Sequence, residues 1–171
     1  VDSAHGGKNG LNVSGSKNQI GTFHQARLIY VVREVLANLP KQLCHSALGE
    51  FVKMGFLTNN GLLSELSLIP AWNFEELWRL LPLAIDEKYR IVARDPFEKK
   101  GERQILNLGH TLGHVLEAYY GLPHGEAVFF GLDFAIRWSQ HRDFLKPEEA
   151  DRAIKLLSDN FKVQTVNHFV A

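Results

Sequence analysis

The chain has 171 residues, of which 45% are hydrophobic and 22% charged, and this composition is typical of a folded globular protein of one or two domains. Its 19 Lys and Arg residues balance 19 Asp and Glu residues, so the formal net charge is zero. This balance argues against a nucleic-acid binder, which normally carries a basic surplus. No apolar run approaches the roughly 20 residues of a membrane span. The single cysteine, Cys44, excludes an internal disulfide and favours a reducing compartment such as the cytoplasm.

The first 27 residues are rich in Gly, Asn, Ser and Lys and show little periodicity, which predicts a loop. Glycines allow backbone amides to approach a ligand, so this loop, with Lys8 and Lys17, has the composition of an anion cradle. A disordered chain end fits the same composition. Residues 27–33 form a β-branched apolar run that fits one strand or the start of a helix. A lone strand must pair elsewhere, so a strand here would belong to a sheet outside this chain.

The rest of the chain is predicted to be helical. Apolar residues recur at helical spacing from residue 41 to 57 and from 74 to 92, and Asn73 followed by Glu76 resembles a capping box at the start of the second helix. Pro82 is expected to kink or split that helix. Beyond a charged loop, helices are expected over 103–120, ended by Gly121, then over 124–141 and 147–157.

Three of the eight histidines cluster in the segment NLGHTLGHVLEAYYGLPHGEAV. His110 and His114 are four residues apart on a predicted helix, so both imidazoles share one face, and a helix hairpin would return His124 to their side. Converging imidazoles suit a zinc site completed by a carboxylate and an open position. Histidines bonded to the backbone are the alternative. The glycines beside the three imidazoles favour the metal site, because glycine in a helix needs a reason such as close backbone approach.

Spacing alone leaves the carboxylate ligand open among Glu50, Glu117 and Glu126. Glu50 lies with Lys53 in the apolar helix LGEFVKM, where charges must be paired, metal-bound or functional. The other histidines stand alone in sequence and are interpreted as surface or capping residues; they include His5, His24, His45 and His141.

Several separate motifs together resemble the 3-dehydroquinate synthase family. The segments are DSAHGGKNGLN, KNQIGTFHQ, LGEFVKMG, GERQILNLGHTLGHVLEA and HGEAVFFG, in the family's order and spacing over roughly residues 1–140. The resemblance implies conversion of 3-deoxy-D-arabino-heptulosonate 7-phosphate to 3-dehydroquinate, with loss of phosphate, in the shikimate route to aromatic amino acids. It also implies NAD and a divalent metal such as zinc or cobalt as cofactors. A hydroxyl is oxidised, phosphate is eliminated, the ketone is reduced and the ring closes by an aldol step.

Carried over by motif, the resemblance implies that Glu50, His110 and His124 are the metal ligands. His114 would then hydrogen-bond the phosphate region and assist proton transfer. Substrate hydroxyl and phosphate oxygens would be contacted by Lys8, Asn18, Lys53 and Asn107, and the substrate carboxylate by Lys88 and Arg103. Contacts to the nicotinamide cofactor would come from Asp2, Lys8 and Lys17.

The resemblance also defines the expected architecture: a mainly α-helical, C-terminal metal- and substrate-binding domain of the dehydroquinate synthase-like fold. We expect residues 1–33 to be a glycine-rich substrate-binding loop and strand that link to a nucleotide-binding α/β domain outside this chain. Residues 34–171 would be the helical domain, truncated at its C-terminal end. The full-length protein is expected to be a homodimer, and the isolated chain to have little synthase activity. The alternatives are another sugar-phosphate cyclase, a metal-dependent alcohol or glycerol dehydrogenase, or a non-catalytic helical module.

Overall fold

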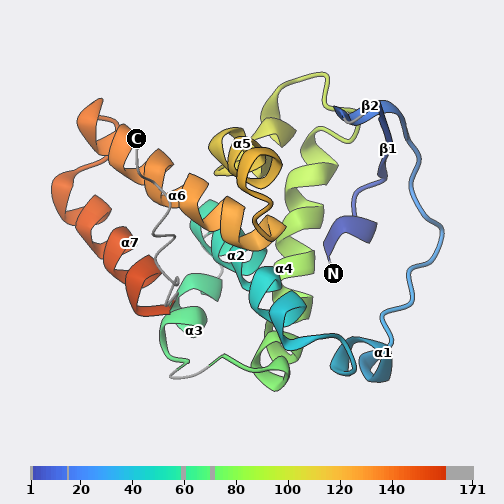
Figure 1. The fold of residues 1–171 in the computed structure, drawn as a ribbon, viewed down its shortest axis with the longest axis horizontal. Helices are drawn as coiled ribbons and strands as arrows, with labels where there is room; N and C mark the ends of the chain where they lie inside the picture. Colours follow the sequence, from blue (N-terminus) through green and yellow to red (C-terminus); the bar gives the residue numbers. More distant parts are fainter. Residues whose placement is uncertain (1, 15, 59–60, 70–71, 161–171) are drawn as a thin grey trace.

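The computed structural model describes residues 2–14, 16–58, 61–69 and 72–160. It is a mainly helical structure with one antiparallel hairpin at its edge (Figure 1), as the sequence predicts for the fold class. After a short 3-10 turn, η1 (Asp2–Ala4), the hairpin strands β1 (Lys8–Val13) and β2 (Ser16–Phe23) lie near the end of the long helix α4 (Phe74–Arg94). Within the described ranges, every helix is too short or too polar to traverse a lipid bilayer.

The hairpin corrects the prediction of an irregular loop over residues 1–27. Leu11 pairs with Ile20, and Gly10 lies opposite Gly21. A side chain at Gly21 would meet the Asn9 carbonyl oxygen at 2.1 Å, so the two backbones pack directly against each other there. Because β1 and the described side chains of β2 are exposed, the sequence shows no alternation of apolar and polar residues. Periodicity therefore could not reveal these strands.

The strand considered for residues 27–33 is absent from the described structure. Residues 24–32 run as an extended segment along the outside of the molecule (Figure 1), without strand pairing among the described residues. The short helix α1 begins at Arg33 and ends at Ala37. The apolar side chains of Leu28 and Tyr30 are exposed on this segment.

Helices α2 (Lys41–Leu57) and α4 follow the predicted apolar spacing. The short helix α3 (Leu62–Ser67) between them was not predicted from the sequence. Asn73 caps α4 as predicted, since its side-chain oxygen accepts a hydrogen bond from the Glu76 amide at 3.1 Å. Pro82 does not split α4, which continues through it to Arg94. The ring of Pro82 is exposed, so it occupies the solvent side of the helix and displaces no core side chain.

The helix predicted over residues 103–120 is in fact two elements, a 3-10 helix η2 (Glu102–Asn107) and α5 (His110–Tyr120). Gly109 separates them because its φ of 78° lies in the left-handed region, which interrupts a right-handed helix. Gly121 ends α5 in the same conformation, as predicted. Helices α6 (His124–His141) and α7 (Pro147–Asn160) then complete the described chain.

The core lies where α2, α4 and α6 meet. Helix α3 packs against α2 and helix α7 against α6, and both add side chains to this core (Figure 1). Its largest fully buried apolar side chains are Leu48, Met54, Leu62, Leu66, Leu132, Leu157, Val52 and Val128. Burial of a side chain of this size contributes roughly 1.5–3 kcal/mol. Because α2 and α6 both belong to this core, residues that they carry at its edge have fixed positions.

Candidate functional site

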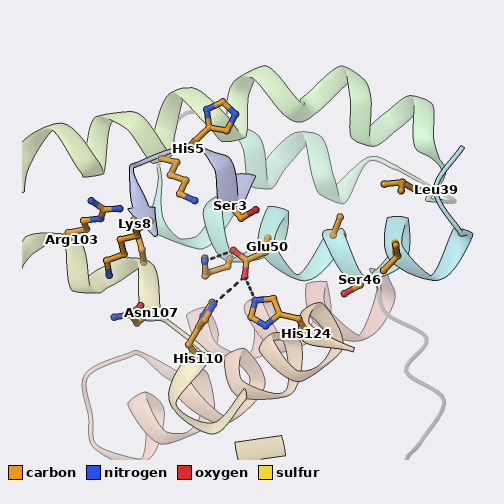
Figure 2. Close-up of a pocket in the computed structure, with 15 residues that line it drawn as sticks. Ser3, His5, Lys8, Leu39, Ser46, Glu50, Arg103, Asn107, His110 and His124 are labelled. Atoms are coloured by element: carbon orange, nitrogen blue, oxygen red, sulfur yellow. Dashed lines mark hydrogen bonds and ion pairs between the residues drawn. The ribbon is translucent and has the colours of Figure 1, made fainter. Parts of the chain in front are cut away.

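A pocket of about 460 Å³ opens between η1, α2, η2 and the first turns of α5 and α6 (Figure 2). Most of the residues predicted to form the site line it: Lys8, Glu50, Lys53, Lys88, Arg103, Asn107, His110 and His124. These residues are more than a hundred positions apart in the sequence, and the packing of α2, α4, η2, α5 and α6 contributes to bringing them together.

Glu50 lies at the centre of the predicted metal site. Its Oε1 atom is 3.3 Å from Nε2 of His110 and 3.3 Å from Nε2 of His124 (Figure 2). The other oxygen, Oε2, accepts a hydrogen bond from the Lys53 ammonium group at 2.5 Å. The carboxylate is therefore anchored through one oxygen, and the second faces two imidazole nitrogens.

These three residues fit a divalent cation. Oε1 of Glu50 is buried and has no hydrogen-bond partner within the described part of the chain, although the two nitrogens are close. Zinc–ligand bonds of about 2.0–2.1 Å in a tetrahedron place neighbouring ligand atoms roughly 3.3–3.4 Å apart. The observed separations match that value. One carboxylate and two imidazoles leave a position open for substrate or water, as in catalytic rather than structural zinc sites.

Each of the three predicted ligands is next to a glycine at which two helices touch. A side chain at Gly49 would lie 2.2 Å from the carbonyl oxygen of Gly125, and one at Gly125 would lie 1.5 Å from that of Ser46. A side chain at Gly109 would lie 2.8 Å from the carbonyl oxygen of Val128. The close backbone approach expected of the glycines beside the three imidazoles is observed at Gly109 and Gly125, and at Gly113, where a side chain would lie 3.0 Å from the carbonyl oxygen of Ala127.

Ser46 adds a further link between the same helices, which the sequence did not reveal. Its hydroxyl oxygen, on α2, accepts a hydrogen bond from the Gly125 amide at the start of α6. A helix begins with unsatisfied N–H groups, and here a neighbouring helix satisfies one of them. The contact fixes His124, the first residue of α6, relative to Glu50 on α2.

The electrostatics keep Glu50 ionised. Burial raises the pKa of Glu50, but the imidazoles of His110 and His124 and the charge of Lys53 outweigh it and hold the pKa well below its usual range. The Glu50 carboxylate in turn raises the pKa of His124; burial opposes this, and Glu117 adds to it. A carboxylate ligand that stays ionised is the form a cation needs.

Cationic groups also line the pocket: Lys8 and Arg103 lie to one side of Glu50 (Figure 2), and Lys53 lies next to it on α2. Lys53 is only 4% exposed. Lys8, at the start of β1, forms an ion pair with Glu98 of the loop after α4. Lys88 of α4 also lines the pocket. Lys8, Lys53 and Lys88 therefore converge, which their positions in the sequence do not show.

Arg103 has structural contacts as well as a place in the pocket wall. It is 2% exposed, and its guanidinium donates hydrogen bonds to the backbone oxygens of Gly6 and Pro96 at 2.7 and 2.9 Å. Burial lowers the pKa of Arg103, opposed by the charges of Glu98 and Asp95. Its Nε atom is buried without a hydrogen-bond partner in the described residues. Arg103 thus joins the N-terminal turn to the loop after α4, and its role toward a substrate carboxylate stays a prediction.

Four predicted site residues are not placed in the pocket wall. Asn18 is exposed on β2 with a φ of 54°, and His114 is exposed on α5, its ring centroid 5.2 Å from that of His110. The side chains of Asp2 and Lys17 lie outside the described residues. The roles inferred for these residues stay predictions.

His5 was interpreted as a surface or capping residue, and this interpretation is wrong. It is buried, it lines the pocket, and its Nδ1 atom lies 3.1 Å from the hydroxyl of Tyr89 on α4. Neighbouring glycines and a lysine gave it a polar sequence context, so only the folded structure reveals its burial.

The fold is that of solved sugar-phosphate cyclases. A 2-deoxy-scyllo-inosose synthase, solved with carbaglucose-6-phosphate, NAD+ and Co2+, superposes with a TM-score of 0.84 over 99% of this chain and 48% of its own. A 2-epi-5-epi-valiolone synthase from Streptomyces hygroscopicus, with NAD+ and Zn2+ bound, superposes with a TM-score of 0.81 over 94% of this chain and 46% of its own. Both are 23% identical to this chain, so the likeness establishes the fold alone.

Sequence comparison identifies the family. The family model described as 3-dehydroquinate synthase C-terminal matches residues 47–168, and that described as 3-dehydroquinate synthase N-terminal matches residues 1–46. The 3-dehydroquinate synthase of Methylacidiphilum infernorum is 37% identical over 160 residues, 92% of this chain and 44% of that protein. The 3-dehydroquinate synthase of Picrophilus torridus is 40% identical over 134 residues, which are 77% of this chain and 39% of that protein.

The chain belongs to the 3-dehydroquinate synthase family. It spans less than half the length of these curated relatives. The family models divide it between residues 46 and 47, within α2. The predicted domain boundary between residues 33 and 34 stays a prediction.

Proposed function

We propose that this chain supplies the metal- and substrate-binding part of a 3-dehydroquinate synthase, which converts 3-deoxy-D-arabino-heptulosonate 7-phosphate to 3-dehydroquinate and phosphate. The observation that carries the proposal is the convergence of Glu50, His110 and His124 at the edge of a pocket lined by basic side chains. Membership of the family supports the same reaction.

Glu50, His110 and His124 would hold a divalent cation such as zinc or cobalt. When bound, such a cation supplies Lewis acidity, which polarises a substrate hydroxyl and stabilises the alkoxide. Lys53 holds the Glu50 carboxylate through Oε2, and this contact leaves Oε1 directed toward the two imidazoles. Lys53 therefore orients a ligand and places positive charge beside the substrate.

The basic side chains suit a substrate with a phosphate and a carboxylate. Lys8, Lys53 and Lys88 supply point charges, and Arg103 a planar guanidinium, within one pocket. Charges of one sign in a cleft strengthen one another's attraction for an anion, because the low-dielectric walls focus the field. Lys8 is paired with Glu98, so a bound anion would compete with that carboxylate for the ammonium group.

NAD would supply the transient oxidation and the later reduction, and it would be regenerated in each turnover. Asp2, Lys8 and Lys17 are proposed to contact it from the N-terminal segment. A homodimeric full-length protein, a location in the cytoplasm, and the absence of nucleic-acid and membrane partners belong to the same proposal. The lyase that eliminates phosphate is the proposed enzyme class.

The test uses the product of the whole gene that contains this sequence. Incubated with NAD, zinc and the heptulosonate phosphate, it should release phosphate and form 3-dehydroquinate without net production of NADH. Chelation should abolish turnover, and zinc or cobalt should restore it. Lys88→Ala should raise the KM, whereas Lys155→Ala, an exposed lysine on α7, should not.

Other outcomes would favour the alternatives. Turnover of a sugar phosphate that lacks a carboxylate, with no turnover of the heptulosonate phosphate, would identify another cyclase. Net reduction of NAD by an alcohol would identify a dehydrogenase. Zinc binding without turnover of any of these compounds would contradict an enzymatic role.

A further inference from the structure

The two ring nitrogens of His124 face carboxylates on opposite sides. Nε2 lies 3.3 Å from Oε1 of Glu50, the central residue of the metal site. Nδ1 lies 3.1 Å from Oε2 of Glu117, which is within hydrogen-bonding distance. Glu117 is an acidic residue of α5 that has no part in the proposed reaction.

His110 is held in the same way by a different acceptor. Its Nε2 atom is also 3.3 Å from Oε1 of Glu50, and its Nδ1 atom is 3.2 Å from the backbone oxygen of Leu108. Both histidines therefore present Nε2 to the same carboxylate oxygen, and both have an oxygen acceptor at Nδ1. The acceptor is a neutral carbonyl for His110 and a carboxylate for His124.

The fold explains how Glu117 reaches His124. Glu117 is seven residues after His110 on α5, so two helical turns bring both side chains to the same face. The turn at Gly121 reverses the chain, and α6 starts at His124 beside that face. Close packing of Gly113 against the backbone of Ala127 keeps α5 and α6 together at this level.

We propose that Glu117 is a positioning residue that accepts the Nδ1–H of His124 and so directs the Nε2 lone pair toward the cation. A neutral imidazole carries one N–H, so when Nε2 is a ligand the proton resides on Nδ1 and requires an acceptor. A carboxylate in this place fixes the tautomer and the ring orientation and makes the ligand more basic. The inference rests on the proposed function only in requiring a cation at Glu50, His110 and His124.

The same geometry argues against a second ion at Glu117. His114, Glu117 and His124 each have a potential ligand atom within 4.8 Å of the others. For His124, however, a second ion at Nδ1 would require both ring nitrogens to be deprotonated at once. The Nδ1–H that remains when Nε2 is a ligand makes Glu117 a hydrogen-bond acceptor instead.

Zinc affinity of the metal-free 171-residue chain tests this role. Chelator competition should show that Glu117→Ala weakens zinc binding by about 10–100-fold, the range measured for such outer partners. Glu117→Gln should lose less zinc affinity than Glu117→Ala, because its amide oxygen still accepts the Nδ1–H of His124. Glu126→Gln is the matched control: it removes one negative charge two residues after His124, where the side chain lines a separate pocket beside Trp72 and Phe74, and should leave the affinity unchanged.

A second readout separates positioning from general support of the fold. Nitrogen NMR of the zinc-bound chain should show His124 protonated at Nδ1, and Glu117→Ala should broaden or shift that signal while the signals of His110 stay in place. Unchanged zinc affinity in both Glu117 variants would overturn this inference but not the proposed metal site. So would a second bound zinc that Glu117→Ala removes. Failure of the wild-type chain to bind zinc would overturn the proposed metal site, and with it this inference.

Discussion

The two walls of the pocket are built in different ways. The proposed ligands Glu50, His110 and His124 lie on helices that touch backbone to backbone at glycines. Lys8 and Arg103, on the other wall, are held by side-chain contacts between a turn, a loop and the base of an exposed hairpin. The positions of the proposed ligands are therefore set by helix docking, which tolerates almost no change, whereas the basic wall depends on a few polar contacts.

The largest effect is expected where two helix backbones touch. Gly125→Ala would place a methyl group 1.5 Å from the Ser46 carbonyl oxygen, so α2 and α6 must separate. We expect a loss of more than about 3 kcal/mol in the free energy of unfolding, measured by urea denaturation, together with loss of zinc binding.

Gly101→Ala is the matched control for Gly125→Ala. It also puts a side chain in a glycine position, at a φ of 83°, but with no atom within 4 Å. It should cost only about 1–2 kcal/mol of backbone strain. Equal losses for the two variants would show that helix docking is not the constraint.

A second prediction concerns the buried ion pair between Glu50 and Lys53 on α2. Glu50→Gln leaves the Lys53 ammonium group, 4% exposed, without its anionic partner. In the presence of chelator, we expect the free energy of unfolding to fall by about 3–5 kcal/mol. The double variant Glu50→Gln with Lys53→Met should recover most of this loss, because no uncompensated charge is left buried. If the double variant were no more stable than Glu50→Gln, the pair would not be the cause.

A smaller effect is expected in the loop that supports Arg103. Asp95 is buried; burial raises its pKa, but hydrogen bonds from the backbone amides of Lys100, Lys99 and Arg103 outweigh this and lower the pKa overall. A carboxyl group whose pKa is lower when folded stabilises the protein above its unfolded pKa of about 3.9 and loses this contribution as the pH falls through the folded value.

Urea unfolding of wild type and Asp95→Asn from pH 7 to pH 3 would measure this contribution. The wild type should be the more stable at neutral pH, and the difference should shrink only below about pH 4. Asp86→Asn, an exposed carboxylate on α4, provides the comparison. A difference that stays constant down to pH 3 would contradict the assignment.

The smallest effect is expected on the hairpin. Leu11 and Ile20 face each other across the strands and are 67% and 62% exposed. Leu11→Ser or Ile20→Ser should change the free energy of unfolding by no more than about 0.5 kcal/mol. Leu132→Ala, in the core beside Gly109, should cost about 2–5 kcal/mol. A large loss at Leu11 would show that the hairpin contributes to the core after all.

The contrast between the walls also explains what the sequence could predict. Local signals were reliable: the Asn73 cap, the Gly121 stop and the apolar spacing of α2 and α4 placed those helices correctly. Non-local contacts were not visible. A hairpin held by backbone pairing, with glycines opposite each other, carries no hydrophobic period, and the left-handed break at Gly109 lies where its backbone meets α6.

The candidate site shows the same difference between local and non-local signals. Spacing on one helix and one turn predicted that His110 and His124 would converge. It left Glu50, Glu117 and Glu126 as equal carboxylate candidates, because Glu50 lies on a separate helix some sixty positions earlier. The resemblance to the family selected Glu50, and the distances agree with that choice. Burial of His5 against Tyr89 had no local signature.

The contact between Ser46 and Gly125 would link cation binding at the proposed site to the stability of the fold. The ligand atoms are correctly spaced only while α2 and α6 are docked, so a cation that binds them binds the folded state and not the open one. Such a ligand, at a hundred times its dissociation constant, adds about 2.7 kcal/mol to folding. Under zinc starvation this added stability would be lost. A larger fraction of the chain would then be open, and proteolysis would lower the amount of the protein.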